Sequence, residues 1–140
     1  MPRSPIKQLY EKLHQSSEIP ITESPDILSK GLYMTMHGKQ EIFIKQSLTI
    51  REKLKVLLHE YSHYVHLTHH YNKESRAECE TIANGSAFFV CAEFGLKLCK
   101  EVNLSKFSND TAVVERVGAA IRIVAGHILN GLKKIDTKEG

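Results

Sequence analysis

Several features that would define a class of protein are missing from this sequence. Its 140 residues contain no apolar run near the roughly 20 residues that a membrane-spanning helix needs. Residues 1–5 lead into a polar segment without the apolar core of a secretory signal. The cysteines, Cys79, Cys91 and Cys99, form no C-x-x-C pair, which argues against a disulfide framework and a thiolate zinc site. We therefore expect a cytoplasmic protein without a membrane partner.

The sequence also lacks a strong excess of either charge. Its formal net charge is +3, and its 19 basic residues are scattered along the chain. A nucleic-acid-binding surface usually gathers such residues on one face. Direct nucleic-acid binding is therefore not indicated. It stands as a third hypothesis, which predicts binding that weakens steeply with salt.

Apolar periodicity predicts one α+β domain over residues 1–140, mainly helical, with a small antiparallel sheet or hairpin. No internal repeat or linker interrupts it. Helices are expected over residues 4–15, 49–67, 74–98 and 108–134. The remaining predictions are an extended connection at 16–29, a hairpin of 32–36 and 41–44 with a turn at 37–40, and a loop at 100–107.

The most informative stretch is residues 59–63, His-Glu-Tyr-Ser-His, which has the form H-E-x-x-H. Thr49 and Glu52 have the spacing of a capping box, which predicts that a helix begins just before the motif. Positions i and i+4 share one helix face, so His59 and His63 can bind the same metal ion. Glu60 lies beside them and can take a proton from water. The stretch therefore predicts a zinc hydrolase site, with His59 and His63 as ligands and Glu60 as the catalytic base.

A catalytic zinc ion usually has three protein ligands, so one more is needed. The next predicted helix offers Glu74, Glu78 and Glu80 near its start. Glu78 and Glu80 are two positions apart and point about 200° away from each other on a helix. Only one of them can face the metal, and helix geometry alone leaves the choice open.

The motif and its flanks resemble a known family. Residues 38–44 (GKQEIFI), Arg51 and residues 57–63 (LLHEYSH) resemble the ImmA/IrrE family of zincin-like metallopeptidases, whose following helix carries E-A-N-x-F-A. Residues 76–96 are similar to the metallopeptidase half of ArdC-like antirestriction proteins. The resemblance implies a zincin-like fold with the sheet beside the motif helix, a bound Zn²⁺, and Glu78 as the third ligand. Ser62 and Cys79 replace a Gly and an Ala of the family pattern.

The function that this resemblance implies is zinc-dependent cleavage of a specific protein. The substrate would be a repressor or regulator linked to mobile elements or stress, and a regulatory protein partner is expected. The strand at 41–45 is expected to pair with an extended substrate by β-addition. The alternative is a catalytically silent metal-binding protein of the same fold that serves regulation or partner recognition. The intact Glu60 speaks against that alternative.

A few further residues carry weaker expectations. Gly85 inside a predicted helix costs about 1 kcal/mol relative to Ala, and a close helix crossing would account for it. His127 is expected to be a packed histidine, and Cys91 and Cys99 small core residues. His66 follows the motif and is expected either to lie beside the metal ligands or at the surface. The side chains of His69, His70 and Tyr71 are expected to be solvated, and the alternative is that one of them stabilises a tetrahedral oxyanion.

Overall fold

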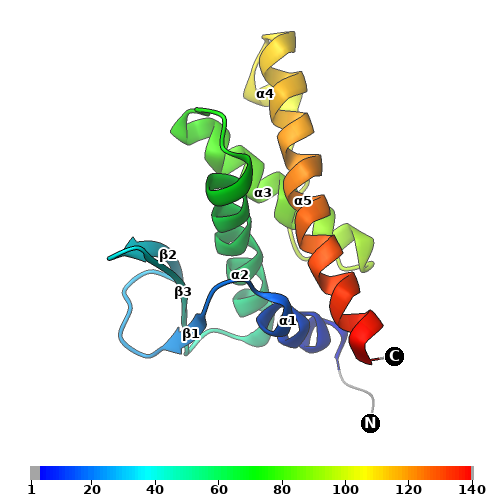
Figure 1. The fold of residues 1–140 in the computed structure, drawn as a ribbon. Helices are drawn as coiled ribbons and strands as arrows, with labels where there is room; N and C mark the ends of the chain where they lie inside the picture. Colours follow the sequence, from blue (N-terminus) through cyan, green and yellow to red (C-terminus); the bar gives the residue numbers. More distant parts are fainter. Residues whose placement is uncertain (1–3, 140) are drawn as a thin grey trace. The chain divides into compact units, whose positions relative to one another are not determined.

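The computed structural model of the chain describes residues 4–139 (Figure 1). Its elements are α1 (Pro5–Ser16), β1 (Ile21–Ser24), β2 (Gly31–Met36), β3 (Lys39–Lys45), α2 (Ile50–Val65), the π-helical turn η1 (His66–His70), α3 (Arg76–Glu93), α4 (Leu104–Phe107) and α5 (Thr111–Glu139). Helices dominate and one small sheet accompanies them, so the predicted α+β class is confirmed.

The chain divides into two compact units, which are described separately. Unit 1 holds residues up to Tyr61 together with those from Asn130 onward, and unit 2 holds Ser62–Leu129. Two helices, α2 and α5, run through these boundaries, so each contributes to both units. The expectation of one domain stays a prediction.

In unit 1, α1 begins at the cap that the sequence supplies. The Ser4 hydroxyl accepts a hydrogen bond from the Lys7 N–H at 3.4 Å, which satisfies a free donor of the first turn. Leu9, Tyr10 and Leu13 recur at helical spacing and are buried. The helix predicted at 4–15 is therefore confirmed.

The predicted hairpin is also present, with a tighter turn than expected. β2 and β3 pair antiparallel as far as Met36 and Lys39, which leaves only His37 and Gly38 between the strands. Both turn residues have positive φ angles, 51° and 77°, as a type I′ turn requires. The four-residue turn expected at 37–40 is wrong because Lys39 and Gln40 already belong to β3.

The extended connection at 16–29 contains a strand that the sequence did not reveal. β1 pairs parallel with β3, from Ile21 opposite Ile42 to Ser24 opposite Lys45. The sheet is therefore mixed rather than antiparallel, with strand order β1-β3-β2. Since β3 is bonded on both sides, substrate pairing with residues 41–45 is wrong for this arrangement.

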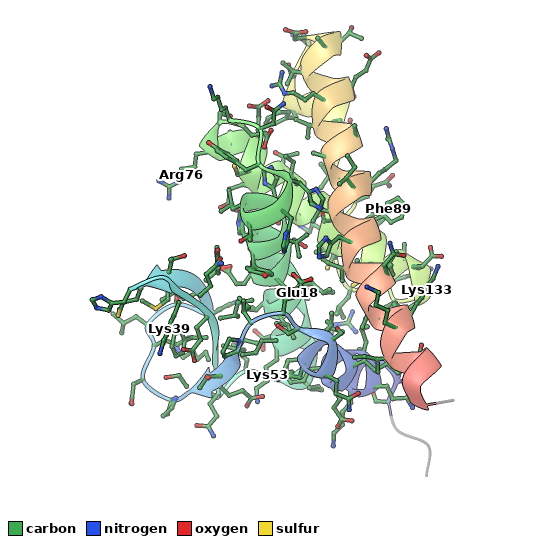
Figure 2. All side chains as sticks on the ribbon, in the orientation of Figure 1. Glu18, Lys39, Lys53, Arg76, Phe89 and Lys133 are labelled. Carbon is green, nitrogen blue, oxygen red and sulfur yellow. The ribbon has the colours of Figure 1, made fainter. Side chains whose placement is uncertain are left out.

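The sheet of unit 1 lies beside the motif helix α2, as expected. A Cβ atom added to Gly31 of β2 would lie 2.1 Å from Cγ1 of Val56, so the strand begins in close contact with the helix. Lys53 of α2, labelled in Figure 2, also forms an ion pair with Glu23 of β1 at 2.7 Å. The helix ends at Val65, and η1 follows directly.

In unit 2, α3 ends at Glu93 rather than at residue 98. Gly95 adopts φ 69°, and the Leu96 N–H donates to the Cys91 carbonyl at 2.9 Å, which closes the helix at a left-handed residue. The close crossing expected at Gly85 is confirmed. A Cβ atom there would lie 2.4 Å from Cδ1 of Ile121 on α5.

The end of the chain is more helical than the sequence indicates. A short helix, α4, occupies part of the predicted loop at 100–107, and Asn103 caps it by accepting from the Ser105 N–H at 3.1 Å. The Asp110 carboxylate caps α5 by accepting from the Ala112 N–H at 2.9 Å. Among the described residues, no helix combines the length and apolar character needed to cross a membrane.

Candidate metal centre

The candidate site is built on α2, which the Thr49 cap positions. The Glu52 N–H donates to Thr49 Oγ1 at 3.2 Å, and the Thr49 hydroxyl reaches the Glu52 carboxylate. The apolar face of the helix is buried through the residues expected to form it: Leu54, Leu57, Leu58, Tyr61 and Val65. His59 and His63 are one turn apart and half-buried, and therefore stay accessible to an ion from solvent.

The structure brings Glu80 to the motif histidines. Within unit 2, Nε2 of His63 lies 3.2 Å from Oε1 of Glu80, whose side chain is 52% exposed. His59 adds its ring from one turn earlier on the same continuous helix. One ring nitrogen each of His59 and His63 and one Glu80 oxygen lie within 4.8 Å of one another.

These donors fit a tetrahedral metal ion. Ligand atoms about 2.0–2.1 Å from a tetrahedral zinc ion are separated by about 3.3–3.4 Å. The distance of 3.2 Å between His63 Nε2 and Glu80 Oε1 is close to that value. Two imidazoles and one carboxylate also make up a ligand set that catalytic zinc sites use, with a fourth position left open.

Glu78, the third ligand implied by the family resemblance, lies elsewhere. Its carboxylate accepts from the Ser75 N–H at 2.8 Å, while its own N–H donates to the Ser75 hydroxyl at 3.1 Å, so the two residues form the capping box of α3. Arg116 of α5 donates to the other carboxylate oxygen. The backbone hydrogen bond and the Arg116 guanidinium keep the pKa of Glu78 below its usual value. The structure therefore places Glu80, and not Glu78, beside the motif histidines, because the α3 cap already uses Glu78.

Glu60 lies between the two histidines in the chain and next to the sheet. It is half-buried, and its Oε2 atom is shielded from solvent. A Cβ atom on Gly31 would lie 3.5 Å from Cγ of Glu60, which is ordinary contact distance, so this side chain lies beside the start of β2. Glu60 therefore lies beside the proposed ligands on a well-packed helix, where a general base is needed.

Residues after the motif are more buried than expected. His66 and Glu74 are almost fully buried and hydrogen-bond each other. Glu74 also accepts from the Asn72 N–H at 3.0 Å and so holds the connection between η1 and α3. The sequence shows no spacing signal for this pair. Tyr71 is 52% exposed, consistent with the solvated position expected of it.

A second cluster of histidines lies in unit 2, and the sequence did not indicate it. Nε2 of His70 is 3.3 Å from Nδ1 of His127, and the His69 and His127 rings stack with centroids 4.8 Å apart. His127 is therefore more than the packed histidine that was expected. No periodic spacing connects residues 69 and 70 with residue 127, so only the packing of α5 beside η1 reveals the cluster.

The cysteines take structural positions. Cys91 is buried, as expected, and its Sγ lies 3.7 Å from that of the half-buried Cys99. Burial raises the pKa of the Cys79 thiol, and the neighbouring carboxylates of Glu74, Glu78 and Glu80 add to the effect. A thiol of raised pKa is a poor nucleophile at neutral pH, so Cys79 is not part of the candidate chemistry.

A hollow of about 300 Å³ lies on the outer face of the hairpin. Its lining alternates along the strands with the buried residues Ile42 and Ile44, which face the other way. The lining residues are Met34, Met36, His37, Lys39, Glu41 and Phe43. None of them belongs to the H-E-x-x-H motif, so this hollow is separate from the candidate centre.

Comparison of the chain with family models, with curated proteins and with solved structures gives no match. The ImmA/IrrE resemblance accordingly depends on the H-E-x-x-H stretch, its flanks and the following helix alone.

Proposed function

We propose that this chain is a zinc-dependent metallopeptidase acting on a specific protein substrate. The observation that carries the proposal is the convergence of His59, His63 and Glu80 to within 4.8 Å of one another, directly beside Glu60. The matching donor set and the separation of 3.2 Å between His63 and Glu80 support zinc as the bound ion.

The roles of the residues follow from their chemistry. His59, His63 and Glu80 hold the ion and leave a fourth position open. When bound there, zinc polarises a carbonyl oxygen and lowers the pKa of coordinated water toward roughly 7. Glu60 acts as the general base that accepts a proton from the attacking water and delivers it to the leaving amine.

The proposed substrate class comes from the motif resemblance. A peptidase of the ImmA/IrrE or ArdC-like type would act in the cytoplasm on a repressor or regulator connected with mobile elements or stress. A regulatory protein partner would present or control that substrate. Only the H-E-x-x-H stretch, its flanks and the following helix carry this part of the proposal.

The test compares the zinc-loaded chain with its Glu60→Gln variant. Both are incubated with a protein extract of the source cells, and new protein N-termini are identified by mass spectrometry. Glu60→Gln should keep its zinc and lower the yield of new termini roughly 10²–10⁴-fold, the usual contribution of a general base. Glu93→Gln, on the exposed end of α3, is the matched control and should behave like the native chain.

One result would contradict the proposal of peptidase activity. If the native chain and Glu60→Gln both hold zinc and give the same termini, Glu60 has no catalytic role. The alternative of a metal-binding regulatory protein without peptidase activity would then replace the proposal.

A further inference from the structure

The second histidine cluster owes its geometry to η1. This π-helical turn follows α2 directly and carries His69 and His70 at its end. Its wider winding turns both rings toward His127 on α5, 57 residues further along the chain. All three residues lie within unit 2. Single π-helical turns are rare and occur frequently at functional sites.

The spacing between two of the rings suits a shared metal ion. His70 Nε2 and His127 Nδ1 are 3.3 Å apart. Two nitrogen ligands about 2.0–2.1 Å from a tetrahedral ion would be separated by about 3.3–3.4 Å. A direct N–H donor bond is usually shorter, about 2.9–3.0 Å between the heavy atoms.

The third ring lies beside His127, with the two ring centroids 4.8 Å apart. One ring nitrogen of His69 lies within 4.8 Å of one of His127. His69 is exposed at the end of η1. The Tyr64 hydroxyl, 3.5 Å from His69 Nε2, gives the ring a neighbour that can orient it, as metal-bound histidines usually require.

The chemistry of the cluster favours transition metals that prefer imidazole. Imidazole ligands suit Zn²⁺, Cu²⁺ and Ni²⁺, whereas Mg²⁺ and Ca²⁺ prefer oxygen ligands.

We propose that His69, His70 and His127 form a second metal site, which takes a divalent transition metal such as Zn²⁺. The site shares no residue with the His59, His63 and Glu80 centre, and it stands whether or not the chain is a peptidase. In sequence, Thr68 and Tyr71 flank the His69–His70 pair, and neither can act as Glu60 does beside His59.

The experiment titrates Zn²⁺ into the metal-free full-length chain by calorimetry and by equilibrium dialysis. The native chain should bind two equivalents. His127→Ala and His70→Ala should each bind one, with the affinity of the lost site reduced by more than the roughly 10–100-fold seen for removal of outer-shell partners. His37→Asn is the control, since it removes an exposed histidine and Asn tolerates the positive φ of 51° at that turn position.

A second experiment measures metal binding at the proposed second site alone. The double variant His59→Ala/His63→Ala removes the first centre and should still bind one equivalent of Zn²⁺. Its Co²⁺ form should show the visible absorption bands of a tetrahedral ion, and these bands should disappear when His127→Ala is added. The helical circular dichroism of each variant shows that it is folded, and His127→Gln replaces His127→Ala if the latter does not fold.

Two results would overturn the proposal. One is a His59→Ala/His63→Ala chain that is folded and binds no Zn²⁺. The other is a set of folded His70 and His127 variants that retain both equivalents. Either result would mean that the His70–His127 contact is ordinary packing.

Discussion

The two histidine clusters of this chain differ in what accompanies the imidazoles. His59 and His63 are joined by Glu80, with Glu60 next to His59 in the chain. His69, His70 and His127 contact one another as rings. At the first cluster, Glu80 would supply a metal ligand and Glu60 a general base, and hydrolysis at a zinc ion uses both. Both clusters are therefore expected to bind metal, and only the first is expected to transfer a proton during hydrolysis.

The largest expected effect is a difference in cleavage activity between variants of the two clusters. His63→Ala should abolish cleavage, because one of the ligands is lost, and should lower zinc content by one equivalent. His127→Ala should lower zinc content by the same amount and leave cleavage unchanged. The measurement is the yield of new protein N-termini beside metal analysis of the same samples. Loss of cleavage in both variants would remove the distinction between a catalytic and a binding cluster.

A second comparison, between Glu80 and Glu78, tests which carboxylate serves the first cluster. Glu80→Gln should weaken zinc binding by more than about 100-fold, beyond the usual cost of removing an outer-shell partner. Glu78→Gln should keep zinc affinity and instead lower stability by about 0.5–2 kcal/mol, because it disrupts the α3 cap. Zinc titration and thermal unfolding of both variants measure these effects. The reverse pattern would restore Glu78 as the ligand.

These residues also show which parts of the fold and of the candidate site can be predicted from the sequence. The motif helix was predictable because Thr49 and Glu52 form a local signal and the apolar residues of α2 recur with a helical period. Ser75 and Glu78 have the same capping spacing, and applying the rule there would have assigned Glu78 to the cap. That assignment would have left Glu74 and Glu80 as candidate ligands, so the sequence narrows the choice, and the structure shows which of the two lies beside His63.

The remaining features depend on contacts that local patterns do not encode. β1 is four residues long, lies within a polar segment, and is defined only by parallel pairing with β3. The His70–His127 contact joins residues 57 positions apart through a π-helical turn. Neither a short parallel strand nor a π-helical turn has a periodic signature of its own. Tertiary packing therefore determines both.

A smaller effect is expected at the α3 cap. Ser75→Ala removes the hydroxyl that accepts from the Glu78 N–H at 3.1 Å. The free energy of unfolding should fall by about 1 kcal/mol, the typical value for a lost N-cap. Zinc stoichiometry should stay at the native value, because neither cluster uses Ser75. Urea unfolding measures the change, and an unchanged midpoint would show that the cap contributes little.

The smallest expected effect concerns the Glu23 carboxylate, and it should change neither histidine cluster. Glu23 is partly buried, which raises its pKa, but hydrogen bonds from Lys53 and Tyr10, each at 2.7 Å, outweigh this and lower the pKa. A lowered pKa in the folded state stabilises the fold above the unfolded pKa of about 4.3, and the effect is lost as the pH falls through the folded pKa.

Glu23→Gln should therefore lower stability at pH 7 by roughly 0.2–1 kcal/mol, and the difference from the native chain should vanish in acid. Urea unfolding between neutral and acidic pH measures this. Both metal sites should keep their affinities. A difference that persists unchanged at the lowest pH would show that the effect comes from packing rather than from the Glu23 charge.

Anomalous diffraction at the zinc edge tests the central claim most directly. Crystals of the full-length chain grown with Zn²⁺ should show a peak bounded by His59, His63 and Glu80, with metal–nitrogen distances of about 2.0–2.1 Å. The Glu78 carboxylate should remain on Ser75 and Arg116 in the same crystals. A peak bounded by Glu78 in place of Glu80, or none between His59 and His63, would contradict the account.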